Sequence, residues 1–172
     1  MKSFSTILTL AFSLFVSTSL SAQSALTKNT EKQKEVGAMI DRFHRMASEA
    51  NFEEYFKLLA TDSEFIGTDA LEIWNKKEFM AYAKPYFDKD QGWSYYPLKR
   101  TIHFNDEGKY GWFSEVLDST YGLCRGSGVV ELIDGQWKLR QYVLSLTVPN
   151  SVARKVVEIK SSEEALQKEK LK

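Results

Sequence analysis

The sequence is poor in cysteine, histidine and proline, with one, two and three of these residues in a chain of 172. The single cysteine, Cys124, excludes an intrachain disulfide and a metal site built from several cysteines. The two histidines, His44 and His103, form no H-x-x-x-H or H-E-x-x-H pattern. We therefore expect neither a metal site nor a cofactor.

The chain also lacks an excess of charge of either sign, because 23 basic residues balance 23 acidic ones. This balance provides no electrostatic footprint for nucleic acid or for an anionic membrane surface. A hydrophobic content of 43% and an aromatic content of 13% are typical of a globular protein. The length is enough for one ordinary domain, and we expect no nucleic-acid partner.

The first residues have the order of a secretory signal peptide. Lys2 precedes an apolar run over residues 7–16, and small residues follow up to Ala22. This run is too short to span a bilayer as a helix of the mature protein. We expect a signal peptide at 1–22, a linker at 23–33, a domain at 34–150 and a charged tail at 151–172. The mature protein would be periplasmic or secreted, without membrane insertion.

Apolar residues at helical spacing predict helices in the first half of the chain. Val36, Ile40 and Phe43 begin such a pattern over residues 31–50. The segments 51–54 and 75–78 both read N-x-x-E, which is typical of a capped helix start. The second of these precedes an aromatic helical face, which Pro85 should kink or end.

From residue 92 onward the apolar period changes to two, which predicts strands over 93–104 and 110–118 after a short one at 64–67. Residues 121–150 form a hairpin around Asp134-Gly135, a strong two-residue turn signal. Counting outward from this turn pairs Gly128 with Gln141, Gly126 with Val143, and Cys124 with Ser145. A face lined by such small residues is either crossed closely by another element or forms the floor of a pocket, and we favour the pocket. The tail should form a short helix.

Helices followed by consecutive antiparallel strands predict an α+β fold with helices on one face of a curved sheet. The phrases FIGTD at 65–69, AKPYF at 83–87, CRGSGVV at 124–130 and WKLRQY at 137–142 resemble the SnoaL-like families of the nuclear transport factor 2-like superfamily. The resemblance implies a cone-shaped domain in which a strongly curved, mostly antiparallel sheet surrounds a cavity closed by N-terminal helices. Superfamily members include ketosteroid isomerase, polyketide cyclases, dehydratases and domains that only bind or dimerise. Many related proteins have a histidine where Val143 stands here.

Two carboxylates are candidates for a general base in such a cavity. Glu115 shares a strand face with Phe113 and Leu117, but it would also suit an ion pair with Arg100 or Arg125. Asp69 lies in a loop, where we favour capping of the next turn by its carboxylate over a catalytic role.

The predicted ligand-binding residues combine an aromatic wall with a few polar side chains, although aromatic residues at helical spacing also suit a plain core. They are Trp74, Tyr82, Tyr86, Trp93, Arg100, Glu115 and Gln141.

Three functions remain open at this point. The first is binding of a small apolar molecule without chemistry. The second is an isomerase, cyclase or dehydratase that uses a buried carboxylate. The third is homodimerisation through the convex face of the sheet, where we expect Val129, Tyr142, Leu144 and Leu146 to be exposed.

Overall fold

The computed structural model describes residues 29–172, so the predicted signal peptide at 1–22 lies outside the described residues. The chain divides into two units, residues 1–35 and 36–172. Residues 29–35 of the first unit are helical, which includes the end of the predicted linker. The fold described below is that of the second unit.

Three helical segments precede or interrupt the sheet: residues 36–48, α2 (Phe52–Lys57) and α3 (Lys76–Phe87). The two predicted caps are confirmed. Asn51 accepts a hydrogen bond from the backbone nitrogen of Glu54. Asn75 and Glu78 form a complete capping box, in which each side chain accepts from the other residue's backbone N–H. α3 runs two residues past Pro85 before it ends at Phe87.

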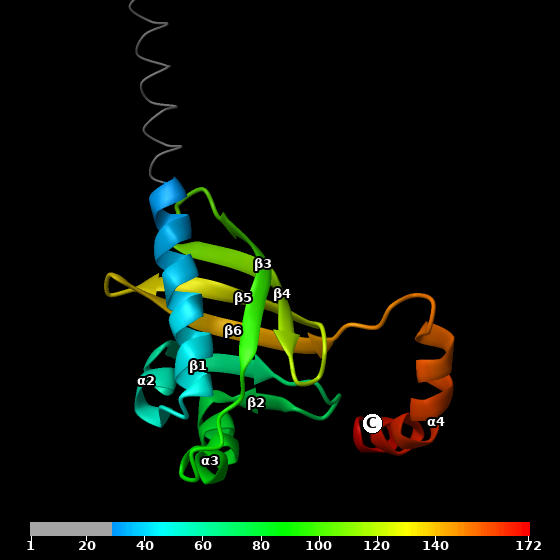
Figure 1. Cartoon of the computed structure of the whole chain (residues 1–172). Helices are drawn as coiled ribbons and strands as arrows, with labels where there is room; N and C mark the ends of the chain where they lie inside the picture. Colours follow the sequence, from blue (N-terminus) through cyan, green and yellow to red (C-terminus); the bar gives the residue numbers. More distant parts are fainter. Residues whose placement is uncertain (1–28) are drawn as a thin grey trace, which may run out of the picture. The chain divides into compact units, whose positions relative to one another are not determined.

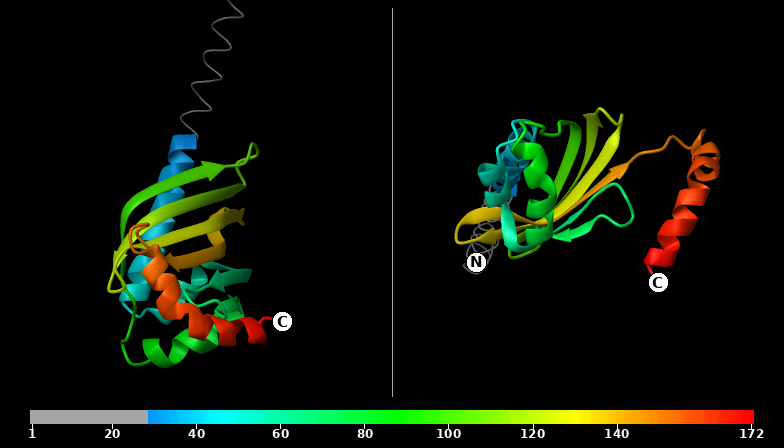
Figure 2. Two further views of the ribbon diagram at one scale, coloured as in Figure 1. Left: turned by 90° about the vertical axis from the view of Figure 1, so that its right-hand side faces the viewer. Right: turned by 90° about the horizontal axis from the view of Figure 1, so that it is seen from below.

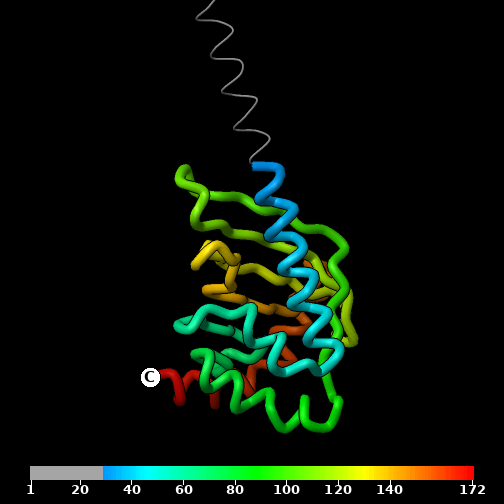
Figure 3. The backbone as a smooth tube through the Cα atoms, turned by 90° about the vertical axis from the view of Figure 1, so that its left-hand side faces the viewer, coloured from blue at the N-terminus to red at the C-terminus, as the bar shows by residue number. Residues whose placement is uncertain are grey.

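Six strands form one sheet in the order β2-β1-β6-β5-β4-β3. Their bounds are β1 (Leu59–Ile66), β2 (Ile73–Asn75), β3 (Tyr95–Phe104), β4 (Tyr110–Ser119), β5 (Cys124–Ile133) and β6 (Gln136–Leu146). Only the β1–β6 pair is parallel. The predicted mostly antiparallel sheet is confirmed, and Figures 1 and 2 show its curvature. Figure 3 shows the helical residues 36–48 crossing one face of the sheet.

The β5–β6 hairpin has the predicted turn but not the predicted register. Asp134 and Gly135 both have positive φ, and Ile133 pairs with Gln136 as expected. The register then shifts at Arg140, so that Val130 lies opposite Leu139 while Val129 lies opposite Gln141. This extra residue forms a β-bulge. Compared with the unbroken register expected from the turn, every later β6 side chain lies on the opposite side of the sheet.

Three predicted pairs are therefore wrong. Gly128 lies opposite Tyr142, Gly126 opposite Leu144, and Cys124 opposite Leu146. Tyr142 and Leu144, expected on the exposed convex face, point into the core and are buried.

The predicted hollow over the two glycines is filled. A Cβ atom at Gly126 would overlap the Tyr142 hydroxyl and the Glu115 side chain, and one at Gly128 would meet the Phe113 ring at 2.8 Å. The glycines thus make room for neighbouring side chains and do not form the floor of a pocket. Of the two interpretations left open by the small residues, close packing is the correct one.

The remaining core is rich in aromatic rings. Tyr55 and Phe79 are fully buried, and the ring of Phe65 stacks on Phe79 with 3.9 Å between centroids. These contacts join α2 and α3 to β1 and hold the helices against the sheet.

The tail forms α4 (Ala153–Lys170), an 18-residue helix, so the prediction of a short helix is wrong. α4 has no buried residue. Among residues 29–172, no helix has the length and apolarity to cross a membrane.

Candidate functional site

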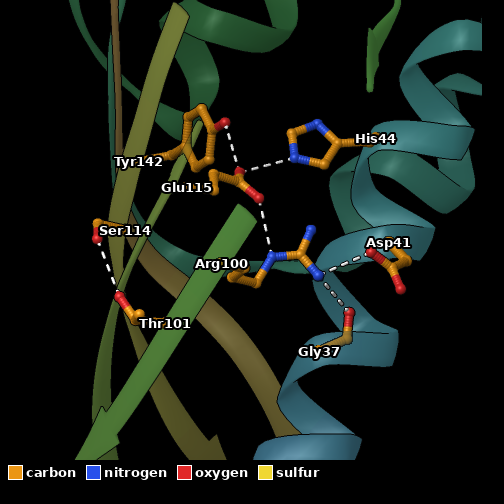
Figure 4. Close-up of polar contacts among 8 residues, drawn as sticks. All are labelled: Gly37, Asp41, His44, Arg100, Thr101, Ser114, Glu115 and Tyr142. Carbon is orange, nitrogen blue, oxygen red and sulfur yellow. Dashed lines mark hydrogen bonds and ion pairs between the residues drawn. The ribbon is translucent and has the colours of Figure 1, made fainter. Parts of the chain in front are cut away.

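A buried carboxylate lies between the sheet and the helix of residues 36–48 (Figure 4). Glu115 is on the inner face of β4 with 1% of its surface exposed. Its Oε2 accepts a hydrogen bond from Nε of Arg100 at 2.8 Å. Its Oε1 lies 3.0 Å from the donating hydroxyl of Tyr142 and 2.8 Å from Nε2 of His44. Both carboxylate oxygens are therefore occupied by protein groups.

Arg100 connects this carboxylate to the helix. Its Nη1 donates to Oδ1 of Asp41 at 2.7 Å and to the carbonyl oxygen of Gly37 at 3.2 Å. Because the guanidinium group lies between two carboxylates, its charge is compensated on both sides. The cluster thus joins β3, β4, β6 and the helix.

The pKa of Glu115 shows which form the cluster favours. Burial alone would raise this pKa, but the hydrogen bonds and charges of His44 and Arg100 outweigh burial and lower it below the ordinary value. Glu115 is therefore ionised at neutral pH, and its buried carboxylate is already engaged by three protein donors. The structure contains the ion pair with Arg100 that was the alternative to a catalytic role. Arg125 is exposed on the outer face.

His44 is the member of this cluster that the sequence did not predict. Since an ionised carboxylate only accepts hydrogen bonds, Nε2 of His44 carries the hydrogen in this contact. Nδ1 has no hydrogen-bond partner in the part of the chain that the structure describes. His44 lines a cavity of about 370 Å³ together with Asp41, Ser94 and Tyr95. The signal that could have found it is a polar residue directly after Phe43 on the apolar side of a helix, where burial demands a partner.

A separate pocket of about 160 Å³ lies between β1, β2, α3 and the β4–β5 connection. Most of its lining is aromatic, and we call it the aromatic pocket. It is formed by Phe65, Gly67, Thr68, Glu72, Trp74, Phe79, Tyr82, Trp93, Tyr95, Tyr121 and Leu144. Leu144 reaches it only because the bulge at Arg140 turns this part of β6 inward. The structure places three of the predicted residues here, namely Trp74, Tyr82 and Trp93.

The aromatic rings of the pocket are positioned by packing on one another. Trp74, on β2, stacks on Tyr82, on α3, with centroids 4.5 Å apart, and it also stacks on Phe79 at 5.7 Å. Tyr121 belongs to the turn between β4 and β5 and is 69% exposed. The pocket therefore has a fixed inner wall and an exposed ring at its rim.

An adjoining cavity of about 430 Å³ extends this region. It shares Tyr82, Trp93, Tyr95 and Tyr121 with the aromatic pocket and adds the predicted Tyr86. The two hollows together form one aromatic region along the side of α3.

Glu72 supplies the charge of the aromatic pocket. Its Oε2 accepts a 3.1 Å hydrogen bond from the backbone nitrogen of Asp69. It occupies space that a side chain at position 67 would take, because a Cβ atom at Gly67 would overlap the Glu72 carboxylate. Burial raises the pKa of Tyr95 to about 12, with smaller contributions from groups that include Cys124, Tyr121 and Glu72. The Tyr95 hydroxyl therefore stays protonated and is available as a donor at neutral pH.

The other predicted site residues lie elsewhere. Arg100 and Glu115 belong to the buried cluster, and neither lines the aromatic pocket. Gln141 donates to Oε2 of Glu64 at 2.9 Å and pairs with the outward-facing Val129, because the bulge places it on the outer face. Asp69 accepts from the backbone nitrogen of Leu71 at 2.9 Å, which is the turn-capping role expected as the alternative to catalysis.

A metal ion requires a close grouping of ligand side chains. Across residues 29–172, no three His, Cys, Asp or Glu side chains are grouped so that they could hold a metal ion.

Comparison with known proteins places the fold. The family model of the SnoaL-like domain matches residues 36–149. An NTF2-like protein of Pseudomonas putida KT2440 is similar in structure, with a TM-score of 0.59 and 13% identity over 70% of this chain and 90% of that one. An NTF2-like protein of Novosphingobium aromaticivorans has a TM-score of 0.58 and 15% identity over 81% of this chain and 96% of the other.

A third similar structure comes from Streptomyces avermitilis and is proposed to be a dehydratase of the NTF2-like family. Its TM-score is 0.58 at 12% identity, over 67% of this chain and 96% of that one. No curated protein sequence matches the chain. At these identities the likenesses establish the fold, while the function has to come from the site.

Proposed function

The chain belongs to the SnoaL-like domain family, and from this premise we propose that it binds a small, largely apolar molecule in the aromatic pocket. The observation that carries the proposal is a concave region lined by aromatic side chains from β1, β2, β3, α3 and the β4–β5 turn. Concave aromatic sites with a few polar groups are the usual form of a small-molecule site.

The buried cluster supports binding over chemistry by Glu115. A general base needs a lone pair within reach of the substrate and a pKa near the working pH. Glu115 is enclosed by three donors, and its pKa is lowered. Its evident role is to hold the helix against the sheet beside the pocket.

The test is a thermal-shift screen of small aromatic and aliphatic molecules. A ligand that binds only the folded protein raises the melting temperature, by an amount that grows with the ratio of the free ligand concentration to its dissociation constant. The variant Tyr121→Ser should lose the shift without loss of stability, because this ring is exposed at the rim. Tyr96→Ser is the matched control, since Tyr96 is also exposed but does not line the aromatic pocket. Equal shifts for the wild type and Tyr121→Ser would contradict binding at this position.

A second candidate function rests on His44. Its Nε2 is held by Glu115, and the ring lines the 370 Å³ cavity, so its Nδ1 is a candidate general base for an isomerase or dehydratase reaction. A panel of β-hydroxy carbonyl compounds, followed by the absorbance of the conjugated product, tests this function. Turnover that disappears in His44→Asn supports it, and the absence of turnover in the wild type contradicts it.

We also propose that the outer face of the sheet forms a homodimer. Trp112 is 51% exposed there and lies opposite Val129 in the β4–β5 ladder. The predicted contribution of Tyr142 and Leu144 to this face is wrong, because both are buried. Light scattering at micromolar concentration should give twice the monomer mass for the wild type and the monomer mass for Trp112→Ser. A monomeric wild type would exclude the dimer.

Export of the domain remains a proposal from the order of the first 22 residues. Mass spectrometry of the protein recovered from a periplasmic extract should give a chain that starts at or near residue 23. An unprocessed chain found in the cytoplasm would contradict export.

A further inference from the structure

We infer that the aromatic pocket is selective for an organic cation, with a methylated ammonium head group as its ligand. This inference rests on the proposed function, namely ligand binding in this pocket. It goes further by assigning the ligand a positive charge, whereas composition and fold alone suggested only an apolar molecule.

The charge of the pocket favours a positively charged ligand. Among the described residues that line it, Glu72 is the one charged side chain, and none of them is a lysine or an arginine. The adjoining cavity is lined by aromatic and uncharged polar residues. A carboxylate in surroundings that hold no compensating cation attracts a positively charged ligand and repels an anionic one.

Glu72 is also available to a ligand. In the described structure its carboxylate accepts one hydrogen bond, from the backbone nitrogen of Asp69, and takes part in no ion pair. It contrasts with Glu54, Glu115 and Glu131, which are all paired with arginine or lysine side chains. Gly67 leaves the space in which this carboxylate lies, and the hydrogen bond from the backbone nitrogen of Asp69 holds the carboxylate there.

The aromatic rings of the pocket favour a large organic cation. The face of an aromatic ring is negative and attracts a cation, most strongly for tryptophan and then for tyrosine. The pocket has two tryptophans and three tyrosines, and the Trp74 and Tyr82 planes are only 25° apart. Such a wall cannot replace the water of a small metal ion, whose ligands are oxygen atoms. It suits a large, weakly hydrated alkylammonium group.

The dimensions indicate where the rest of the ligand would lie. The 160 Å³ pocket takes the head group beside Glu72, and a neutral remainder extends toward the 430 Å³ cavity past Tyr82 and Tyr121. The ligand class is therefore an N-methylated amine with an uncharged tail.

The experiment compares choline with 3,3-dimethyl-1-butanol, which has the same shape but no charge. Titration calorimetry at low ionic strength, supported by tryptophan fluorescence, measures both affinities. Choline should bind at least tenfold more tightly than the alcohol. Glu72→Gln should weaken choline about tenfold and leave the alcohol unchanged, because the amide oxygen still accepts from Asp69. Glu107→Gln, in an exposed turn, is the matched control and should change neither affinity.

Gly67→Ala is an independent variant that leaves Glu72 in the sequence but displaces its carboxylate. It should cause the same loss of choline binding, with circular dichroism confirming that the protein is folded. Equal affinity of choline and the alcohol, or no effect of Glu72→Gln, would overturn the cation inference while leaving ligand binding intact. Binding of neutral molecules alone would do the same. If neither choline nor any neutral compound bound, the proposed function itself would fail.

Discussion

The hydroxyl group of Tyr142 donates to Oε1 of Glu115 across 3.0 Å, directly beside Gly126. This contact exists because the bulge at Arg140 turns Tyr142 inward and because Gly126 has no side chain in the way. A donor on β6 thus reaches a buried carboxylate on β4 across the intervening β5, and the same inward turn places Leu144 in the lining of the aromatic pocket.

Gly126→Ala should destabilise the protein. The added methyl group would overlap the Tyr142 hydroxyl and the Glu115 side chain, and overpacking of this kind costs about 1–3 kcal/mol. Urea denaturation measures the change. Gly37→Ala is the control, because its methyl group would meet Ile102 at an ordinary 3.9 Å, and a helical glycine-to-alanine change gains about 0.5–1 kcal/mol. Equal stability of Gly126→Ala and the wild type would mean that Tyr142 does not occupy this position.

Glu115→Gln should be among the most destabilising single changes in the domain. It leaves the buried Arg100 with only Asp41 as a carboxylate partner, and removing one member of a buried ion pair costs about 3–5 kcal/mol. Glu107→Gln, at an exposed turn, should change the unfolding free energy by no more than about 0.5 kcal/mol. If the two variants were equally stable, the cluster would not hold the helix against the sheet.

The same carboxylate predicts a dependence of stability on pH. The folded-state pKa of Glu115 lies below the ordinary value of 4.5, although burial opposes this, because His44 and Arg100 favour the ionised form. Its contribution is therefore complete above pH 4.5 and is lost as the pH falls through the lower folded-state value. The difference in unfolding free energy between the wild type and Glu115→Gln should be constant from pH 7 to 5 and shrink below 4.5. A difference that grew on acidification would contradict the lowered pKa.

The bulge can be tested by comparing deletion with substitution. Deleting Arg140 would remove the extra residue and leave an unbroken β5–β6 ladder, in which Gln141 still lies opposite Val129 and Tyr142 still lies opposite Gly128 on the inner face. We expect this variant to fold with Tyr142 and Leu144 inside, as judged by near-UV circular dichroism. Arg140→Ala keeps the extra residue and loses only the ion pairs to Asp62 and Glu131, at a cost of about 0.2–1 kcal/mol. A deletion variant that lost its near-UV signal would show that the bulge itself is needed for the fold, and not only the inward positions of Tyr142 and Leu144.

The turns and caps of this fold could be predicted because their signals are local. Asp134-Gly135 specifies a two-residue turn by its backbone preferences, and Asn75 with Glu78 specifies a helix start. The strand faces of β4 followed from simple alternation, which placed Glu115 inside. All of these features depend on residues within a few positions of one another.

The predictions that were wrong or missing concern features that depend on distant contacts or on one additional residue. Nothing in the sequence around Arg140 marks the bulge. Relative to simple alternation, the bulge exchanges the two faces in the second half of β6, so that Gln141 lies on the outer face and Tyr142 on the inner face. The His44–Glu115 contact joins residues 71 positions apart. β2 has three residues, too few for an alternation to be recognised, so the position of Glu72 beside Trp74 was missed.

The central claim is that the aromatic pocket, and not the hollow expected over the glycines, holds the ligand. The difference density between a crystal soaked with choline and an unsoaked crystal tests this most directly. We predict density for the ammonium group inside the aromatic pocket, beside the Glu72 carboxylate and against the aromatic wall. Density at another location, or an unchanged pocket at a concentration that saturates binding in solution, would contradict the account.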